Sequence, residues 1–464
     1  MLRFYNTLSG KKEPFVPLHP DKALLYTCGP TVYDYAHIGN FRAYIFEDLL
    51  RRYLKFKGYQ VTQVMNITDV DDKIIKASKA AGQDIGEYTR EYIDAFFADL
   101  DALRIERAEF YPRATEHIPQ MVALVKRLQE KDFAYIRENS IYFRLSAFPS
   151  YGKLSKIDLQ GIKPGARIDL DEYGKEDVRD FVLWKGKREG EPFWETELGA
   201  GRPGWHIECS AMSMHYLGES FDIHTGGVDL IFPHHENEIA QSEAATGRQF
   251  VRYWLHCRHL IVEGEKMSKS KGNYYTLRDL LEEGYEPMAI RYLLLSTHYR
   301  RQLNFTREGL TQATHSLKNL GDFLLRLRQS KPIEGYNQAL GKATKEAAAG
   351  MERALDDDLN ISPALASVHQ LVKEVNISLE RGEIGEKNMS EVREVLDKFD
   401  RVTGILPPVE EESIDETIRK LIAERESARR NKEYQKADLI REKLRRMGII
   451  LEDTRDGVRW KRKP

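Results

Sequence analysis

Two lysines and two serines stand close together in one short segment, Lys266-Met267-Ser268-Lys269-Ser270. Two ammonium groups and two hydroxyls in a loop of this length offer several hydrogen-bond donors to one anion. The segment continues into Lys271-Gly272-Asn273, so a solvated loop rich in Lys and Ser is the alternative interpretation. A second segment of the phosphate-binding type lies far upstream, and it makes a phosphate-binding loop the better interpretation.

The second segment is His37-Ile38-Gly39-Asn40, which lies between stretches with different patterns. Residues 23–28 form an apolar run typical of a strand, and residues 41–57 carry apolar side chains at helical spacing. Gly58 predicts the end of this helix, and residues 60–67 alternate apolar and polar side chains as a second strand does. The order strand, helix, strand predicts a βαβ unit with parallel strands.

The turn before this predicted helix is suited to a phosphate. A helix N-terminus offers unpaired N–H groups and the positive end of its dipole. His37 would lie in the turn, Gly39 would let a ligand approach the backbone, and Asn40 could cap the helix. Taken singly, His37 could equally be a loop histidine with ordinary hydrogen bonds, and Asn40 an ordinary N-cap.

Together, the two segments resemble the two signature sequences of the class I aminoacyl-tRNA synthetases. The resemblance implies that the first segment touches the triphosphate and sugar of ATP, and that the lysine loop closes over the phosphates while an adenylate forms. Attack at a phosphate needs positioned cations and donors more than covalent help from the protein. Asn40 departs from the commonest pattern, which ends in a second histidine, but an amide still donates a hydrogen bond. The implied catalytic residues are His37, Asn40, Lys266 and Lys269, and the implied ATP contacts add Gly39, Ser268 and Ser270.

A glycine-rich turn, Gly226-Gly227-Val228-Asp229, resembles the turn that holds the adenosine ribose in the same family. Glycines permit close approach of the sugar, and a carboxylate can accept hydrogen bonds from both of its hydroxyls. In isolation, Gly-Gly-x-Asp is equally typical of an ordinary turn. Beside the two signatures, the resemblance assigns Gly227 and Asp229 to ATP binding.

Four further side chains could hold a metal ion. Cys28 ends the first predicted strand, and Cys209 lies in a separate apolar stretch, so both could also be small core residues. His234 and Glu238 are four residues apart at a predicted helix start and would share one face, although a solvated Glu-rich helix start is the alternative. Two thiolates, an imidazole and a carboxylate suit Zn²⁺ if the fold gathers them. The spacing does not prove the gathering, because the sequence has no C-x-x-C pair.

The resemblance then narrows to the cysteinyl-tRNA synthetases and spans essentially the whole chain, including residues 66–73, 201–212 and 221–237. It implies one Zn²⁺ per chain held by Cys28, Cys209, His234 and Glu238, and Mg²⁺ bound with ATP. Cys257 matches none of the family's ligand positions, and we assign it to packing. In the family, the cysteine pocket is lined by Thr68, Trp205 and His224, each of which could otherwise be structural. The implied partners are ATP, L-cysteine and tRNA(Cys).

A zinc ion would explain how this site selects an amino acid. Serine and cysteine differ by one atom, and a pocket that discriminates by size gains only about 1–3 kcal/mol. A thiol ionises and binds Zn²⁺ at about 2.3 Å, whereas an alcohol is a poor ligand at neutral pH. We therefore expect a zinc ion that selects the substrate, with room for the substrate sulfur, and no editing domain.

Length and composition are typical of a cytosolic enzyme with several domains. The 464 residues are enough for about three domains. The three cysteines are scattered, which argues against a disulfide framework. Met1 to Gly10 lack the apolar core of a secretion signal, and no run approaches the ~20 apolar residues of a membrane span. We expect a cytoplasmic protein without membrane contact and, by the family's default, a monomer.

The predicted fold class is α/β. A Rossmann-type, doubly wound parallel-sheet catalytic domain would carry an α/β insertion and be followed by a helical bundle and a small anticodon-binding domain. Within the insertion we expect a helix at residues 118–131, strands at 140–145 and 181–184, and a turn at Lys163-Pro164-Gly165. Later helices are expected at residues 285–296, 308–328, 343–355 and 362–379, the last capped by Ser362 with Pro363 as its first helical residue. The expected divisions are residues 1–115 and 205–255 for the two catalytic halves, 116–204 for the insertion that contacts the tRNA acceptor end, 256–306 for the lysine-loop junction, 307–405 for the bundle, 406–417 for a linker and 418–464 for the anticodon-binding domain.

The charge of the last segment differs from the rest of the chain. Residues 418–464 hold 16 Lys and Arg against 8 Asp and Glu, whereas residues 1–417 hold 55 against 65. A basic domain that follows RNA phosphates is one interpretation, and a helix with mixed i,i+4 ion pairs over residues 424–446 is the other. Trp460 lies among basic residues and could stack on an unpaired base. We predict base contacts from Arg430, Asp438 and Asp453, each of which could equally form a surface ion pair.

Two other functions remain as alternatives. A related ligase joins cysteine to an amino-sugar through the same adenylate, but its relatives lack a terminal RNA-reading region such as residues 410–464. A non-catalytic protein that binds zinc and RNA would not need His37, Lys266 and Lys269 together. Charging of tRNA would exclude the first alternative, and cysteine-dependent exchange of pyrophosphate into ATP would exclude the second.

Overall fold

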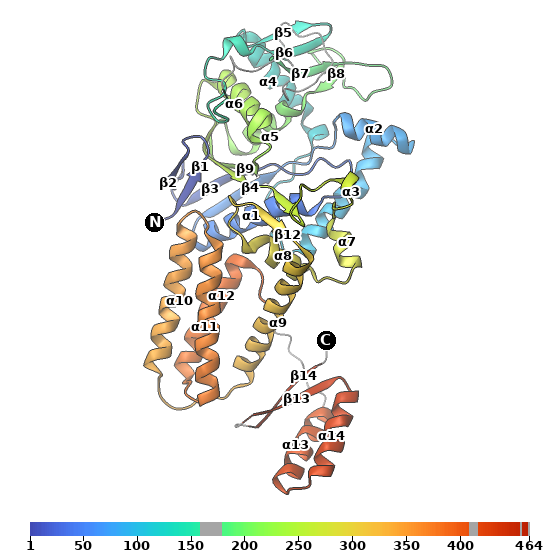
Figure 1. The fold of residues 1–464 in the computed structure, drawn as a ribbon. Coiled ribbons are helices and arrows are strands. Elements are labelled where there is room, and N and C mark those ends of the chain that lie inside the picture. Colours follow the sequence, from blue (N-terminus) through green and yellow to red (C-terminus); the bar gives the residue numbers. More distant parts are fainter. Residues whose placement is uncertain (158–178, 408–415, 455–456, 463–464) are drawn as a thin grey trace.

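The computed structural model describes residues 1–157, 179–407, 416–454 and 457–462. Four parts follow one another along an elongated molecule (Figure 1). A small α/β region lies at one end, followed by a parallel sheet with helices on both faces, a bundle of long helices, and a domain of two helices and a β-hairpin. Among the described residues, no helix is long and apolar enough to cross a membrane.

The centre of the catalytic region is a four-stranded parallel sheet in the order β10-β9-β3-β4. Helix α1 packs against one face, and α5 packs against the other, with α6 beside it. The predicted βαβ unit is confirmed, because β3 and β4 pair in parallel on either side of α1 in the chain. The elements are β3 (Lys22–Thr27), α1 (Ile38–Phe56), β4 (Gln60–Met65), α5 (Trp205–Leu217), β9 (Phe221–Gly227), α6 (Glu236–Thr246) and β10 (Val251–Cys257).

Helix α1 begins three residues earlier than the expected position 41. Its N-cap residue is His37 and not Asn40, which lies inside the first turn, where its side chain accepts the N-cap N–H as the second half of a capping box. At the other end, Gly58 has φ +92°, a left-handed conformation that glycine adopts without strain, and the chain turns there into β4. The helix carries the first signature at its N-terminus and ends close to the start of the next strand.

Several shorter elements surround the sheet. The N-terminal hairpin β1–β2 is antiparallel, β11 and β12 form a separate parallel pair, and α2 and α3 follow β4. Their bounds are β1 (Arg3–Asn6), β2 (Lys11–Pro14), α2 (Asp72–Ala81), α3 (Ile85–Ala102), β11 (Leu260–Val262), α7 (Leu277–Glu282) and β12 (Leu303–Phe305).

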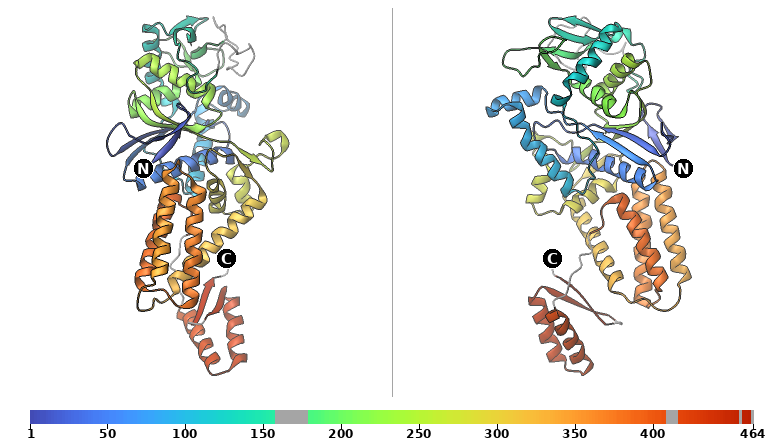
Figure 2. Two further views of the ribbon diagram at one scale, coloured as in Figure 1. Left: turned by 60° about the vertical axis from the view of Figure 1, so that its left-hand side comes forward. Right: turned by 180° about the vertical axis from the view of Figure 1, so that it is seen from behind.

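The insertion has its own antiparallel sheet in the order β5-β6-β7-β8, which packs with α4. The predicted helix and both predicted strands are present, while the expected turn at 163–165 lies outside the described residues. Seen from behind, this sheet lies at the end of the molecule opposite the C-terminal domain (Figure 2). The elements are α4 (Ile118–Glu130), β5 (Ala134–Arg137), β6 (Ser140–Phe143), β7 (Phe181–Gly186) and β8 (Gly201–Pro203).

The helical bundle shares one continuous apolar core with α1. The expected cap of the helix near 362 is wrong, because α11 begins at Ile361 and its N-cap residue is Asn360. Ser362 instead donates its hydroxyl to the carbonyl of Ser296 at 2.9 Å, which fastens α11 to α8. The sequence interpretation placed no separate helix after α11, but α12 is present. The helices are α8 (Pro287–Ser296), α9 (Arg307–Gln329), α10 (Gln338–Asp356), α11 (Ile361–Arg381) and α12 (Glu386–Thr403).

The C-terminal domain contains α13 (Glu416–Arg430), α14 (Tyr434–Arg446) and the antiparallel hairpin β13–β14 (Ile449–Thr454 and Gly457–Arg462). The single helix considered over residues 424–446 is therefore interrupted, with Lys432 at φ +63° in the turn. A small apolar core joins these elements. Residues 408–415 of the expected linker lie outside the described residues.

Candidate active site and metal centre

A cleft of about 760 Å³ opens at the carboxyl edge of the parallel sheet. Strands β3, β4, β9 and β10 all end there, at Thr27, Met65, Gly227 and Cys257. Ligands of open α/β sheets bind at this edge. The cleft brings together segments that are far apart in the sequence: its lining includes Cys28, His37, Gly39, Asn40, Thr68, Trp205, Cys209, Gly227, Asp229, His234 and Lys266.

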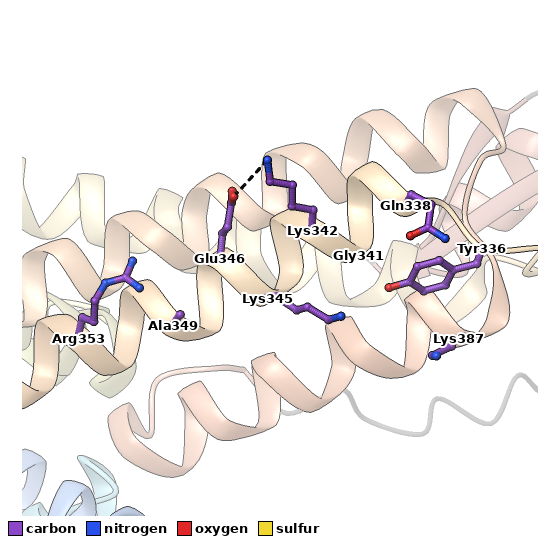
Figure 3. Close-up of a pocket in the computed structure, with 9 residues that line it drawn as sticks. All are labelled: Tyr336, Gln338, Gly341, Lys342, Lys345, Glu346, Ala349, Arg353 and Lys387. Carbon is purple, nitrogen blue, oxygen red and sulfur yellow. Dashed lines mark ion pairs between the residues drawn. The ribbon is translucent and has the colours of Figure 1, made fainter. Parts of the chain in front are cut away.

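A second hollow of about 730 Å³ lies on the helical bundle, between α10 and the beginning of α12 (Figure 3). Its lining contains the basic side chains Lys342, Lys345, Arg353 and Lys387. Lys342 pairs with Glu346 at 3.8 Å, and both side chains are largely exposed. This groove offers charge but no thiol or imidazole, so the sheet-edge cleft is the candidate active site.

The first signature forms a reciprocal cap at the start of α1. The Asn40 N–H donates to His37 Nδ1 at 3.1 Å, and the His37 N–H donates to Asn40 Oδ1 at 3.1 Å. Because Nδ1 accepts a hydrogen bond, the neutral imidazole carries its proton on Nε2, which is then available as a donor. Burial lowers the pKa of His37 and favours this neutral form.

Because Gly39 has no side chain, the lysine loop can pack against the first signature. A Cβ at this position would come within 2.9 Å of the His37 ring and 3.2 Å of Met267 Cε. The loop therefore lies directly on the first signature. Any larger residue at position 39 would push the histidine or the loop away.

The lysine loop makes a short 3₁₀ turn at Lys269–Lys271. The backbone N–H of Ser268 donates to Asn273 Oδ1 at 2.8 Å, and the hydroxyls of Ser268 and Ser270 are 2.8 Å apart. Lys266 lines the cleft, whereas the ammonium of Lys269 forms an ion pair with Asp34. The loop thus holds one lysine at the cleft and the other on a carboxylate of the facing wall.

The glycine-rich turn lies at the end of β9, as expected for a ribose-binding turn. A Cβ on Gly227 would come within 2.3 Å of Asp229 Oδ1, so a larger residue here would displace the carboxylate from this position. Asp229 is exposed at the cleft, with its Oδ1 3.8 Å from His259 Nδ1. The Asp229 side chain is 62% exposed, so its carboxylate can accept hydrogen bonds from a sugar.

A buried group of sulfur, nitrogen and oxygen donors forms the floor of the cleft. One ligand atom from each of Cys28, His234, His235 and Glu238 lies within 4.8 Å of the others. His234 Nε2 is 3.0 Å from Glu238 Oε1, and Cys28 Sγ is 3.3 Å from His235 Nε2. Cys209 is 1% exposed and hydrogen-bonds to Cys28 and His234. The four predicted ligands therefore lie close together, although the residue after β3, helix α5, the turn before α6 and α6 itself supply them.

The four donors that lie within 4.8 Å of one another include His235, which is not among the predicted ligands. His235 Nε2 faces the sulfur of Cys28, and its Nδ1 is 2.8 Å from His256 Nε2. His256 Nδ1 in turn lies 2.8 Å from the Thr7 hydroxyl. Both nitrogens of His235 are thus occupied in a chain of side chains beneath Cys28, which suits a residue that orients a ligand.

Charges in the floor oppose and balance one another. The hydrogen bond between the two thiols lowers the pKa of Cys209 to about 6 and raises the pKa of Cys28 well above its usual value. Burial alone would lower the pKa of His234, but Cys209 and Glu238 outweigh burial and raise it to about 10. Burial would raise the pKa of Glu238, but His224 and His234 lower it to about 2. The anionic side chains of Cys209 and Glu238 therefore stabilise a positive charge next to them in the floor.

The donor set fits a zinc ion. Glu238 Oε1 is buried and has no hydrogen-bond donor among the described residues, although it lies beside His234 Nε2. Two ligand atoms that face each other in this way can share a cation. Thiolate, imidazole and carboxylate together are ligands that Zn²⁺ accepts. The described residues can thus hold one such ion at the floor of the cleft.

The three predicted cysteine contacts have different positions. Trp205 stacks on His234 with ring centroids 4.2 Å apart, and Thr68 donates to Glu208 Oε2 at 3.1 Å; both residues line the cleft. His224 is fully buried, with its Nε2 2.9 Å from Glu238 Oε2 and its ring stacked on Trp254. His224 therefore lies behind a predicted metal ligand and outside the cleft lining.

The predicted anticodon contacts also differ among themselves. Arg430 and Asp438 are exposed on α13 and α14. Asp453 binds the Arg425 guanidinium through both oxygens at 2.5 and 2.8 Å, so it is engaged inside the domain. Trp460 is partly buried against the small core, and its carbonyl accepts a hydrogen bond from Gln329 Nε2 at 3.1 Å.

The sequence interpretation missed two sets of residues at this site. Asp34 lies three residues before His37, and no local pattern indicates that it faces Lys269 across 235 residues. His235 and His256 were also unassigned, and the adjacent pair His234-His235 was the signal that could have identified one of them. Cys257 is 2% exposed and belongs to the main apolar core, which agrees with its assignment to packing.

Three family models match successive parts of the chain. A model described as the tRNA synthetases class I (C) catalytic domain matches residues 14–315. A DALR domain model matches residues 351–407, and a model described as the cysteinyl-tRNA ligase anticodon binding domain matches residues 411–460.

Curated relatives match over their whole length. A protein of Solibacter usitatus named cysteine–tRNA ligase is 51% identical, and the match covers 100% of both chains. Proteins of the same name from Leptospira interrogans and Chlamydia pneumoniae are 49% and 50% identical, with at least 98% of each chain covered.

Solved structures share the fold at lower identity. A methionyl-tRNA synthetase of Mycobacterium tuberculosis in complex with methionyl-adenylate has a TM-score of 0.64 and 17% identity, covering 83% of this chain and 92% of that one. A putative arginyl-tRNA synthetase of Campylobacter jejuni has a TM-score of 0.55 and 13% identity, covering 83% and 93%. These likenesses show a common fold.

Proposed function

The chain belongs to the cysteine–tRNA ligases, a family of class I aminoacyl-tRNA synthetases, and on that premise we propose how its residues divide the work. The protein is an aminoacyl-tRNA ligase that attaches cysteine to tRNA. The observation that carries the residue assignments is the meeting of the partly buried Cys28 and the buried Cys209, His234 and Glu238 with both signature sequences at one cleft.

In the first step, the carboxylate of cysteine attacks the α-phosphate of ATP, forms cysteinyl-adenylate and releases pyrophosphate. His37 Nε2 donates to a phosphate oxygen, and the ammonium groups of Lys266 and Lys269 neutralise the charge that develops on the phosphates. Asn40 holds His37 in the required tautomer through their reciprocal cap. Asp229 accepts hydrogen bonds from the ribose hydroxyls, and Mg²⁺ enters with ATP. Positioned donors of this kind act without an enzyme nucleophile.

Cysteine is chosen at the floor of the cleft. One Zn²⁺ per chain, held by Cys28, Cys209, His234 and Glu238, would bind the substrate thiolate and leave serine without a comparable ligand. His235 and His224 orient Cys28 and Glu238 from behind. Trp205 forms an apolar wall beside the amino acid, and Thr68 supplies a polar edge. A size-based pocket would gain only about 1–3 kcal/mol, so the donor set accounts for selection without editing.

In the second step, the terminal ribose of tRNA(Cys) attacks the carbonyl of the adenylate and releases AMP, with the 2′-hydroxyl as the first acceptor in keeping with the class. The insertion holds the acceptor end, and residues 418–464 bind the anticodon region. Arg430, Asp438 and Trp460 are the proposed RNA contacts, and Asp453 acts through Arg425. We propose a cytoplasmic monomer. The match to an anticodon-binding model over residues 411–460 disfavours the amino-sugar ligase.

Two assays test this assignment. The purified protein should exchange pyrophosphate into ATP when cysteine is present, and should charge tRNA(Cys) with cysteine. Removal of residues 408–464 should raise the KM for tRNA about tenfold or more, because phosphate contacts dominate nucleic-acid affinity. The same deletion should leave the exchange reaction within about twofold, since the cleft lies in the catalytic region. Loss of exchange in the truncated protein would contradict the division of labour, and absence of both activities in the full chain would contradict the function.

A further inference from the structure

Lys269, one of the two signature lysines, is held by a carboxylate on the opposite wall of the cleft. Its ammonium pairs with Asp34 Oδ2, and the Lys269 side chain is 62% exposed while that of Asp34 is 29% exposed. The hydrogen bond to Asp34 raises the pKa of Lys269, so the lysine stays charged. The pair therefore joins an exposed lysine of the loop to the wall that faces it.

Asp34 belongs to a rigid part of that wall. Its Oδ1 accepts the Tyr35 N–H at 2.8 Å. The preceding carbonyl, that of Tyr33, accepts a hydrogen bond from the Tyr88 hydroxyl at 2.8 Å, and the Tyr35 hydroxyl donates to Glu91. Both Tyr88 and Glu91 belong to α3. Asp34 is thus fixed from behind, and the loop is the partner that can move.

The pair also lies beside the phosphate-binding residues. The Lys269 ammonium is 4.9 Å from the centroid of the Tyr274 ring, and that ring meets the His37 ring edge-on at 5.2 Å. Asp34 and His37 both line the cleft. A triphosphate held by His37 would therefore compete with Asp34 for the same ammonium group.

We propose that Asp34 is a positioning residue that acts as an internal counterion for Lys269. Without nucleotide, Asp34 holds the lysine and keeps the loop against the first signature. When ATP binds, Lys269 exchanges the carboxylate for the phosphates, and Asp34 takes the lysine back as pyrophosphate leaves. This inference rests on the proposed function, because it assumes that Lys269 acts on ATP.

A second ion pair in the same loop provides a matched control. Lys271 pairs with Glu265 at 2.8 Å, and both side chains are more than half exposed. This pair closes the loop on itself and does not reach the facing wall. Glu265→Gln therefore removes an ion pair of the same type without releasing Lys269.

The decisive variant is Asp34→Asn, because asparagine can still accept the Tyr35 N–H while losing the charge that holds Lys269. An exposed ion pair shifts an equilibrium by about 1.5- to 5-fold. In the cysteine-dependent exchange reaction, the KM for ATP and that for pyrophosphate should each fall about two- to fivefold. The KM for cysteine should not change, kcat should stay within about twofold, and Asp34→Glu should retain the wild-type values.

A measurement without turnover makes the test independent of activity. Amide hydrogen exchange of residues 266–273 in the absence of nucleotide should be faster in Asp34→Asn than in wild type or Glu265→Gln, and ATP should remove the difference. An unchanged or raised KM for ATP, or unchanged exchange of the loop amides, would overturn the proposal. If the wild type shows no cysteine-dependent exchange activity, the proposed function fails; if it does and Asp34→Asn behaves like Glu265→Gln, this inference alone fails.

Discussion

The floor of the cleft and the lysine loop above it serve the same reaction with opposite physical designs. Cys209, His234 and Glu238 are at most 1% exposed, and their protonation is governed by one another. Lys269 is 62% exposed and holds a single exchangeable ion pair. A rigid, water-excluded floor suits discrimination between cysteine and serine, whereas an exposed loop suits a substrate whose charge must be gripped and released.

Among variants outside the metal-binding floor, the largest effect should come from removing the loop's proposed catalytic charge. Lys269→Ala should lower kcat of cysteine-dependent exchange by roughly 10²- to 10³-fold, the range for loss of one group that stabilises a transition state. Zinc content, measured by atomic absorption, should stay at the wild-type level because the floor is untouched. Lys271→Ala, which removes the neighbouring lysine paired with Glu265, should change kcat less than about twofold. Loss of zinc from Lys269→Ala would contradict the claim that the floor binds its metal independently of the loop.

A smaller effect should come from a carboxyl buried beneath the floor. Glu47 on α1 is 0% exposed, accepts the Thr225 hydroxyl at 2.9 Å, and leaves Oε2 without a hydrogen-bond partner among the described residues. Burial raises its pKa to about 8. The folded protein therefore binds this proton more tightly than the unfolded chain does. The protonated Glu47 side chain therefore stabilises the folded protein. This stabilisation is complete below about pH 4.5 and is lost as the pH rises through about 8.

Glu47→Gln should remove that pH dependence. Glutamine can accept the Thr225 hydroxyl without ionising, so the variant should match wild type at pH 5 and melt at a higher temperature at pH 8 and above. Each pKa unit corresponds to about 1.4 kcal/mol, so the gain should reach a few kcal/mol. Melting curves of both proteins from pH 5 to 9 measure the difference. A gain that is equal at every pH would mean that Glu47 does not titrate in this range.

The parts of the site that sequence reasoning could reach are those with local patterns. The βαβ unit follows from the alternation and helical spacing of apolar residues. In residues 266–270 and 37–40, the side chains that could bind phosphate are close neighbours in the sequence. The gathering of Cys28, Cys209 and Glu238 was expected from resemblance, and the fold brings them together. Spacing alone could not predict it, because three elements far apart in the chain supply the ligands.

Other features depend on tertiary contacts that leave no local pattern. The pairing of Asp34 with Lys269 joins two loops, and the chain from His235 through His256 to Thr7 joins the metal floor to the N-terminal hairpin. The cap of α1 was misassigned because His37 and Asn40 are both able to cap, and geometry decides between them. The sequence predicts a base contact at Asp453 because nothing local indicates its partner, Arg425, which lies 28 residues away on another element.

The most direct test of the account is amino-acid selection in Cys209→Ser. Serine keeps the size of the side chain but replaces a thiolate ligand with an alcohol, which binds Zn²⁺ poorly. We predict that this variant loses zinc and cysteine-dependent exchange together, by about 10³-fold or more, while its melting shows a folded protein and its activity with serine does not rise above the wild-type background. Normal cysteine activation by a zinc-free Cys209→Ser protein would contradict the claim that a metal held by this floor selects the substrate.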